Sequence, residues 1–313
     1  MTPNAHDVAT VVRSRLSLEP VEIRRFQTGL CHYVFSVTTA DRQKFVVRIA
    51  TPETTPLLAG GIYWNEFLRP VGVPLPKIVA SNVEPAEIQF PFVILEQIPG
   101  HDLGAVYRTL SSPDKLQIVS ELVRIQKRVS LLPEASGFGL AYSYSEPPRY
   151  RGWEAAVLAI LERAQQRMQR SVHPGRPYAR RARLILTRDP TYFAAIRPVP
   201  FLDDTTTKNV LVDQGRLTGI VDVDQLGFGD PLLTIGLTQT SLLASGHDVD
   251  YVEHWMDLLD LDEEQRRVVR AYSLLYCADF MSELGLPFNK DEQPEIDLEK
   301  FARLKSIFET LAE

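Results

Sequence analysis

The segment from Phe201 to Pro231, FLDDTTTKNVLVDQGRLTGIVDVDQLGFGDP, restricts the fold of this chain more than any other stretch. It contains two β-type runs, Val210 to Val212 and Leu217 to Val221, joined by a polar turn that includes Gly215. Short β-type runs separated by such a turn are typical of an antiparallel hairpin. The segment therefore predicts a hairpin whose open end is flanked by polar residues.

Oxygen-bearing side chains gather at the open end of this predicted hairpin. Asn209 enters the first strand and Asp222 leaves the second, so the hairpin returns both to the loop that holds Asp203 and Asp204. Oxygen ligands without histidine or thiolate suit Mg²⁺, which takes one or two carboxylates and completes its shell with water and phosphate oxygens. The segment thus predicts a magnesium site and phosphoryl transfer.

The length of the chain predicts two lobes, because 313 residues exceed what one hydrophobic core usually serves. We expect an α+β fold with a strand-rich lobe of residues 1–97 and a mainly helical lobe of residues 98–313. In the second lobe, apolar residues recur at helical spacing after Ser112, the expected N-cap of a helix.

The first lobe is expected to contain a β-hairpin, formed by runs from Tyr33 to Thr38 and from Phe45 to Ile49. The segment from Leu57 to Arg69 is expected to be a helix despite two glycines. The apolar run from Phe90 to Gly100 is expected to be a buried strand that ends at a Pro-Gly turn.

Charge and cysteine content narrow the classes of partner. The formal net charge is −6 and the sequence pI is near 5.6, which argues against binding to nucleic acid or to an anionic membrane surface. Cys31 and Cys277 form neither a disulfide framework nor a zinc pattern. No apolar run approaches the roughly 20 residues that span a bilayer. We expect a cytoplasmic protein with a small-molecule partner.

The chain resembles the aminoglycoside phosphotransferase family, relatives of the protein kinases, from about Phe26 to Thr240. The family's catalytic loop, H-G-D-x-x-x-x-N, is followed by a hairpin and by I-D-W or I-D-x-D. The matching positions here are Leu202, Asp203, Asp204, Asn209, Asp222 and Asp224. The resemblance implies a protein-kinase-like bilobal fold in which Asp204 is the base that accepts the proton of the acceptor hydroxyl. It also implies that Asn209 and Asp222 bind Mg²⁺, with Asp224 beside them.

The resemblance extends to the nucleotide side of the fold. Arg48 in FVVRIA stands where the kinases have a lysine that holds the α- and β-phosphates, and Glu66, before GVPLPKIVA, is its expected partner. The run FVILEQIPG is similar to the family's hinge, so backbone groups at Glu96 and Ile98 are expected to bind the adenine edge. Gly29 lies in the nucleotide-covering turn. The implied cofactors are ATP, with GTP as an alternative, and Mg²⁺.

The sequence leaves two alternatives to a small-molecule kinase. Leu202 and Asp203 replace the family's histidine and glycine, which favours a nucleotide-binding pseudokinase without transferase activity. Retention of Asp204, Asn209 and Asp222 argues for an active enzyme. A protein kinase is the weaker alternative, because the chain has no D-F-G or A-P-E motif and no room for a long activation loop.

The acceptor is expected to bind to the helical lobe, and it carries a hydroxyl. Asp279 and Glu283 are four residues apart and share a predicted helical face with Tyr276, Phe280 and Leu284. This mixed acidic and apolar face suits an amine with a carbon skeleton, so the hypothesis is an aminoglycoside-like compound, amino alcohol or sugar metabolite. The other acidic candidates of this lobe are Asp248, Asp250, Glu253 and Asp257.

Overall fold

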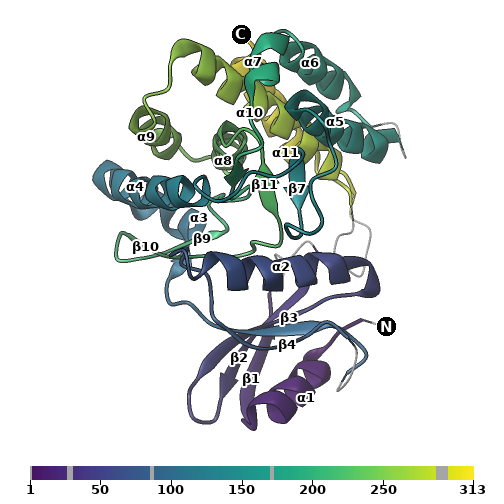
Figure 1. Ribbon diagram of the computed structural model, residues 1–313, viewed down its shortest axis with the longest axis vertical. Coiled ribbons are helices and arrows are strands. Elements are labelled where there is room, and N and C mark those ends of the chain that lie inside the picture. The colour runs from purple at the N-terminus through teal and green to yellow at the C-terminus, as the bar shows by residue number, and fades with distance from the viewer. Residues whose placement is uncertain (1, 27–30, 85–87, 170–172, 287–294) are drawn as a thin grey trace.

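The computed structural model describes residues 2–26, 31–84, 88–169, 173–286 and 295–313. Its first part is a five-stranded antiparallel sheet in the order β1-β2-β3-β5-β4 (Figure 1). The strands of this sheet are β1 (Pro20–Arg25), β2 (Tyr33–Thr39), β3 (Lys44–Ile49), β4 (Ile78–Asn82) and β5 (Phe92–Glu96). The predicted hairpin is confirmed, because β2 pairs with β3 from Tyr33↔Ile49 onward.

Two helices accompany the sheet. Helix α1 (Ala5–Leu16) begins at a capping box formed by Asn4 and buries Val8, Val11 and Val12 against the sheet. Helix α2 (Thr55–Leu68) lies between the sheet and the helical part of the molecule (Figure 1). The helix predicted from Leu57 to Arg69 is thus confirmed.

The second part is mainly helical and contains two small sheets. One sheet has the order β10-β9-β6 and the other β7-β11-β8. Their strands are β6 (His101–Asp102), β7 (Gly139–Ala141), β8 (Pro200–Phe201), β9 (Val210–Asp213), β10 (Arg216–Ile220) and β11 (Leu226–Phe228). The longer helices are α4 (Ser112–Val129), α5 (Trp153–Gln169), α6 (Arg176–Leu186), α8 (Leu232–Ala244), α9 (Asp250–Leu258), α10 (Glu263–Glu283) and α11 (Leu298–Ala312), and the short ones are α3 (Leu103–Val106) and α7 (Pro190–Ala195).

Helix α4 begins one residue earlier than the sequence predicted. Its N-cap is Ser111, whose hydroxyl accepts a hydrogen bond from the backbone N–H of Asp114, while the Asp114 carboxylate accepts from the Ser111 N–H. This reciprocal capping box satisfies two backbone donors, which a cap at Ser112 would leave without partners. The predicted core-facing stripe of α4 is confirmed at Val119, Leu122, Val123 and Val129, which are buried, but Leu116 of the same prediction is exposed.

The main hydrophobic core joins α2 to the helical part. Helix α10 packs against α5, α6, α8 and α11, and its buried residues share one core with Trp64 and Leu68 of α2. The indole N–H of Trp64 donates to the Ala141 carbonyl at 2.8 Å. A boundary between residues 97 and 98 follows the end of the five-stranded sheet and stays a proposal, since α2 packs on both parts.

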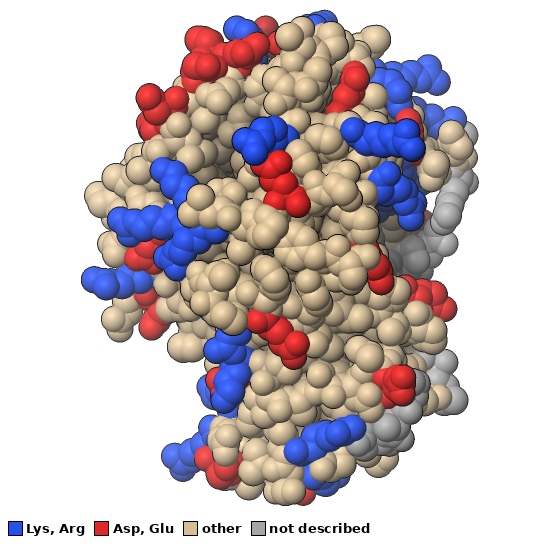
Figure 2. Space-filling model, viewed as in Figure 1, with Lys and Arg blue, Asp and Glu red and all other residues tan. Residues whose placement is uncertain are grey.

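Charged side chains of both signs lie on the surface of the molecule. On the face shown in Figure 2, Lys and Arg side chains are interspersed with Asp and Glu. Among the described residues, no helix is long and apolar enough to cross a membrane.

Candidate active site

The β9–β10 hairpin brings two of the predicted metal ligands to one end. Its strands pair antiparallel from Arg216↔Asp213 to Ile220↔Val210. Beyond the last pair, the Val221 N–H donates to the Asn209 carbonyl at 2.9 Å. Asn209 and Asp222 therefore leave the hairpin side by side, as the sequence predicted.

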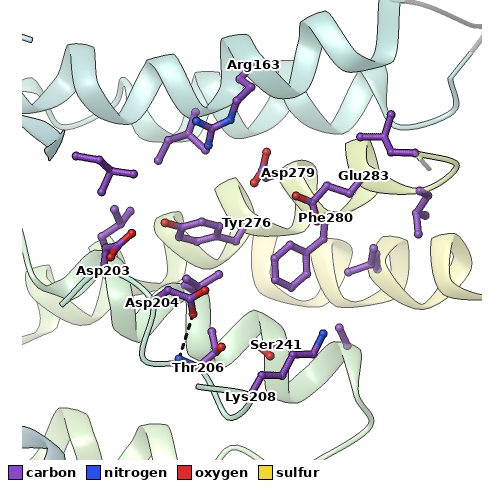
Figure 3. A pocket seen from close by; sticks show the side chains of 18 of the residues that line it. Arg163, Asp203, Asp204, Thr206, Lys208, Ser241, Tyr276, Asp279, Phe280 and Glu283 are labelled. Atoms are coloured by element: carbon purple, nitrogen blue, oxygen red, sulfur yellow. Dashed lines mark hydrogen bonds between the residues drawn. The ribbon is translucent and has the colours of Figure 1, made fainter. Parts of the chain in front are cut away.

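Asn209 also connects this end of the hairpin to the loop of Asp204. Its side-chain N–H donates to the backbone carbonyl of Asp204 at 3.2 Å. The Asp204 carboxylate accepts a hydrogen bond from the Thr206 N–H at 3.3 Å (Figure 3). These two bonds fix the acidic residue directly beside the hairpin end.

The loop is supported without the family's histidine. The Gln126 side chain accepts from the Leu202 N–H at 3.0 Å and donates to the Leu202 carbonyl at 2.9 Å. The Thr234 hydroxyl donates to the same carbonyl at 3.0 Å. Leu202 is fully buried, so an apolar side chain fills the space and polar groups from α4 and α8 hold the backbone.

Asp203 and Asp204 form an electrostatically strained pair. Burial, followed by repulsion from Asp204, raises the pKa of Asp203 to about 8. Burial also raises the pKa of Asp204, against the lowering effect of its hydrogen bond with Thr206. A carboxylate with a raised pKa is a better proton acceptor than an ordinary aspartate at neutral pH, which suits a general base.

Arg48, on β3 of the five-stranded sheet, binds two carboxylates of the segment that follows β10. Its Nη2 donates to Asp222 Oδ1 at 2.7 Å and to Asp224 Oδ2 at 2.6 Å. His32 contacts the same Asp224 oxygen through Nε2 at 3.0 Å. Burial by itself would raise the pKa of Asp224, but Arg48 and His32 outweigh it and hold that pKa below its ordinary value.

Glu66 is not the partner of Arg48, so this expectation is wrong. Residues on α2 rotate by about 100° each, and Glu66 follows the buried Trp64 by two positions, which turns its side chain toward solvent. The face of α2 that approaches Asp224 instead presents Gly60 and Gly61. A Cβ on Gly61 would lie 2.5 Å from Asp224 Oδ1. Two glycines of α2 therefore pack against Asp224, and Asp224 supplies the carboxylate that binds Arg48.

The hinge segment leaves one backbone donor available. The Glu96 N–H donates to the Lys77 carbonyl at 2.9 Å, so this group is already used within the sheet. Within the described parts of the chain, the Ile98 N–H has no hydrogen-bond partner. The Ile98 side chain packs against Gly219, where a Cβ would lie 2.4 Å from its Cδ1. Gly29 lies outside the described residues.

The donor set beside the hairpin fits Mg²⁺. One oxygen of Asp222 binds Arg48, and the carboxylate is still about half exposed, with 56% of the side chain accessible. Asn209 uses its side-chain nitrogen on Asp204, which leaves its amide oxygen for a cation. One carboxylate and one amide oxygen are the few protein ligands that Mg²⁺ takes when phosphate and water complete its shell. No group of three or more His, Cys, Asp or Glu suited to a metal occurs among the described residues.

A cavity of about 1650 Å³ opens from the loop of Asp204 into the helical part. Helices α5, α8, α10 and α11 line it together with Asp203, Asp204 and Lys208. Figure 3 shows Tyr276 next to the two aspartates, with Arg163 above it. Asp204 therefore borders both the predicted metal site and a space large enough for a small molecule.

The acidic face of α10 lines this cavity as predicted. Asp279, Glu283 and their apolar neighbours on the helix all border it. Arg167 binds Asp279 at 3.1 Å and Glu283 at 3.5 Å. Burial, followed by repulsion from Asp279, nevertheless raises the pKa of Glu283 to about 7, against the lowering effect of Arg167 and Arg163. Burial therefore outweighs the two arginines in its effect on this pKa.

The other acidic candidates of the helical lobe lie elsewhere. Asp248 and Asp250 bind Lys115, at 2.7 Å and 3.4 Å. Asp257 binds Arg266 at 2.7 Å. Helix α9 carries Glu253 as an exposed residue, and none of these groups borders the cavity.

Sequence reasoning missed the residues that support the site from a distance. His32, Gln126, Thr234 and Arg167 each contact a candidate site residue through a side chain. His32 comes three residues after Gly29 of the predicted nucleotide-covering turn, so the sequence did indicate that it lies near the site. The other three belong to helices whose sequence pattern indicates only burial and amphipathicity.

Comparisons with known proteins agree with this geometry. A family model described as "Phosphotransferase enzyme family" matches residues 22–271. No curated protein sequence matches the chain. Similar solved structures include aminoglycoside phosphotransferase APH(4)-Ia (TM-score 0.72, 16% identity, 98% of each chain covered). Another is the streptomycin-ATP-APH(2")-IIa ternary complex (TM-score 0.68, 13% identity, 98% of this chain and 99% of that chain).

A third similar structure is the GDP complex of a mutant aminoglycoside 2'-phosphotransferase-IIIa (TM-score 0.70, 16% identity, 99% of this chain and 97% of that chain). At such identities the structures establish the fold, which is protein-kinase-like. The family model covers most of the chain, from before β2 into α10. The chain therefore belongs to the phosphotransferase enzyme family and is a small-molecule kinase by fold and family.

Proposed function

We propose that this enzyme transfers the γ-phosphoryl group of ATP, with Mg²⁺, to a hydroxyl of a small molecule that carries an amine. The observation that supports this most directly is the position of Asp204. Its carboxylate borders the large cavity, and its backbone carbonyl is bonded to Asn209 of the proposed metal site. The loop of Asp204 would thus lie between an acceptor in the cavity and the phosphates at the metal site, which brings the two reactants together.

The nucleotide is proposed to bind between residues 1–97 and 98–313. The Ile98 N–H and the carbonyl of Glu96 are suited to an adenine edge, and Arg48 to the phosphates. Asn209 and Asp222 would hold Mg²⁺, which neutralises and orients phosphate oxygens when bound. Solved neighbours contain AMP-PNP or GDP, so ATP is the proposed donor and GTP the alternative.

In the proposed reaction, Asp204 orients the acceptor hydroxyl and accepts its proton. The bond between the acceptor oxygen and the γ-phosphorus forms while the bond to the β,γ-bridging oxygen breaks, which gives a phosphate ester and ADP. Lys208 also borders the cavity, next to Asn209. Gln126 and Thr234 support the loop at Leu202, where the family has histidine. The loss of that histidine is therefore a weak argument for a non-catalytic pseudokinase.

Buried acid in the cavity favours a cationic acceptor. Burial disfavours the charged form of a carboxyl group, and a bound ammonium group would stabilise that form. Asp203, Asp279 and Glu283 all show this shift, with burial as the largest cause of each raised pKa. The apolar rings of Tyr276 and Phe280 on the same face suit the carbon skeleton of an amino alcohol or aminoglycoside-like compound.

The proposal is tested by a screen of ADP release with Mg-ATP against a library of small-molecule alcohols, in which each amino alcohol is paired with its deaminated analogue. We expect turnover above the ATPase background for amino alcohols and much less for their analogues. Equal turnover of both members of each pair would contradict the cationic acceptor. Nucleotide binding without turnover of any acceptor would favour the pseudokinase.

Replacing the acidic wall should weaken acceptor binding more than catalysis. In Asp279→Asn and Glu283→Gln, loss of attraction for the ammonium group is expected to raise the acceptor KM by about 10-fold, with kcat within about threefold of wild type. Steady-state kinetics at two salt concentrations checks this, because salt should raise the wild-type KM more than that of the variants. Glu253→Gln, on the exposed face of α9, is the matched control. An unchanged KM in both cavity variants would remove the acidic wall from the acceptor site.

The pH dependence of KM provides an independent check. Glu283 has its pKa raised to about 7, so it is neutral below that pH and negative above it. The acceptor KM is therefore expected to fall as pH rises through about 7, while the acceptor amine stays protonated. Glu283→Gln should remove this step from the KM profile. A profile with the same step in the variant would show that another group titrates.

A further inference from the structure

Three elements of the strand-rich part converge on Asp224. His32 precedes β2, Arg48 is on β3, and Gly61 is on α2, and all three contact the Asp224 side chain or pack against it. Asp224 itself follows β10 in the other part of the molecule. Its side chain is only 10% exposed. One buried carboxylate thus connects both walls of the proposed nucleotide cleft.

The arginine at position 48 suits this arrangement better than a lysine. One guanidinium nitrogen, Nη2, binds both Asp222 and Asp224. Nη1 has no hydrogen-bond partner among the described residues, and the buried Nε has none either. A guanidinium can hold two carboxylates through one nitrogen and still present another to a phosphate. An ammonium group offers a single point of charge and no such fork.

Helix α2 is shaped to admit this carboxylate. A Cβ on Gly60 would lie 2.4 Å from the Asp224 carbonyl, and one on Gly61 would lie 2.5 Å from Asp224 Oδ1. Side chains at these positions would displace Asp224 from Arg48. Two adjacent glycines cost a helix about 1 kcal/mol each relative to alanine. The close approach of Asp224 to the helix explains why both are present.

We propose that Asp224, and not Glu66, is the carboxylate that positions Arg48 on the nucleotide phosphates. This inference rests on the phosphate-binding role proposed above for Arg48. Asp224 acts as a positioning residue, because it touches Arg48 and His32 and leaves Asp222 and Asn209 as the metal ligands. In this chain the carboxylate that other kinases take from the helix comes from the segment after the hairpin.

The test is a double-mutant cycle read by titration calorimetry of ATP, in the presence of Mg²⁺ and in EDTA. Arg48→Met and Asp224→Asn are each expected to raise the dissociation constant by about 10-fold, the effect of losing a charged hydrogen bond. The double variant should be no weaker than Arg48→Met alone, because both changes remove one interaction. Glu66→Gln should not weaken binding.

Further arms separate this role from metal binding and from misfolding. The loss in Asp224→Asn should persist in EDTA, whereas the loss of a metal ligand should appear only with Mg²⁺. Gly61→Ala retains every polar group and favours the helix. Introduced alone, it should weaken ATP binding as Asp224→Asn does, and added to Arg48→Met it should cause no further loss. Melting temperatures of all variants identify any that fail to fold.

The outcomes distinguish the two proposals. If Arg48→Met leaves ATP affinity unchanged, the phosphate role of Arg48 in the proposed function is wrong. If Arg48→Met weakens binding but Asp224→Asn and Gly61→Ala do not, the positioning role alone is wrong. Multiplicative effects in the double variant, or a loss in Glu66→Gln as large as that in Asp224→Asn, would also overturn it.

Discussion

Replacing Asp204 with asparagine is expected to lower kcat by about 10²–10⁴-fold, the contribution of a positioned general base. The Mg-ATP dissociation constant should stay within about threefold of wild type, because the base acts on the acceptor and contacts no nucleotide group. The change preserves shape and the hydrogen bond with the Thr206 N–H. Steady-state kinetics with the acceptor, together with calorimetric titration of Mg-ATP, measures both quantities.

The neighbouring Asp203 provides the matched control for this variant. Its pKa of about 8 means that it is largely protonated at neutral pH, so asparagine resembles its natural state. Asp203→Asn is therefore expected to lower kcat by less than about 10-fold. A reversed order, with Asp203→Asn inactive and Asp204→Asn active, would transfer the role of base to Asp203. Equal loss of turnover and of nucleotide binding in Asp204→Asn would contradict its assignment as base.

Removing either proposed metal ligand should uncouple nucleotide binding from magnesium. In Asn209→Ala and Asp222→Ala, the affinity gained by adding Mg²⁺ to ATP is expected to fall by at least about 10-fold. Mutation of a residue that only hydrogen-bonds to a metal ligand already lowers metal affinity by about 10–100-fold. Turnover should fall with it. Titrations of ATP with Mg²⁺ and with EDTA give the gain for each variant directly.

Asp213 offers a control of the same chemistry at the other end of the hairpin. It ends β9, is exposed, and lies far along the ladder from Asn209. Asp213→Asn should keep the full magnesium-dependent gain. If Asn209→Ala and Asp222→Ala keep it as well, the cation is held elsewhere.

Much of the site could be predicted from sequence because it is local. The hairpin of Val210–Asp213 and Arg216–Ile220 is determined by neighbouring residues and a short turn, so the positions of Asn209 and Asp222 followed from chain geometry. The acidic face of α10 was likewise predicted by helical spacing. The roles of Asp204, Asn209 and Asp222 came from the family resemblance and await the variants above.

The parts that could not be predicted depend on contacts between distant segments. Arg48 and Asp224 are 176 residues apart, and nothing local to either indicates the pair. Glu66 was assigned from the family resemblance, as the glutamate before GVPLPKIVA, but the rotation of α2 decides which residues approach Asp224. Gln126 supports Leu202 from 76 residues away, through a helix whose pattern predicts only a buried stripe.

The central claim is tested most directly by the mass of the acceptor after incubation with enzyme and Mg-ATP. The enzyme is predicted to convert an amino alcohol identified by the screen to its monophosphate ester, with one ADP formed per ester. Asp204→Asn, at the same concentration and with Mg-ATP still bound, should form almost none. ADP formation without any phosphorylated acceptor, or equal ester formation by Asp204→Asn, would contradict a small-molecule kinase that uses Asp204 as its base.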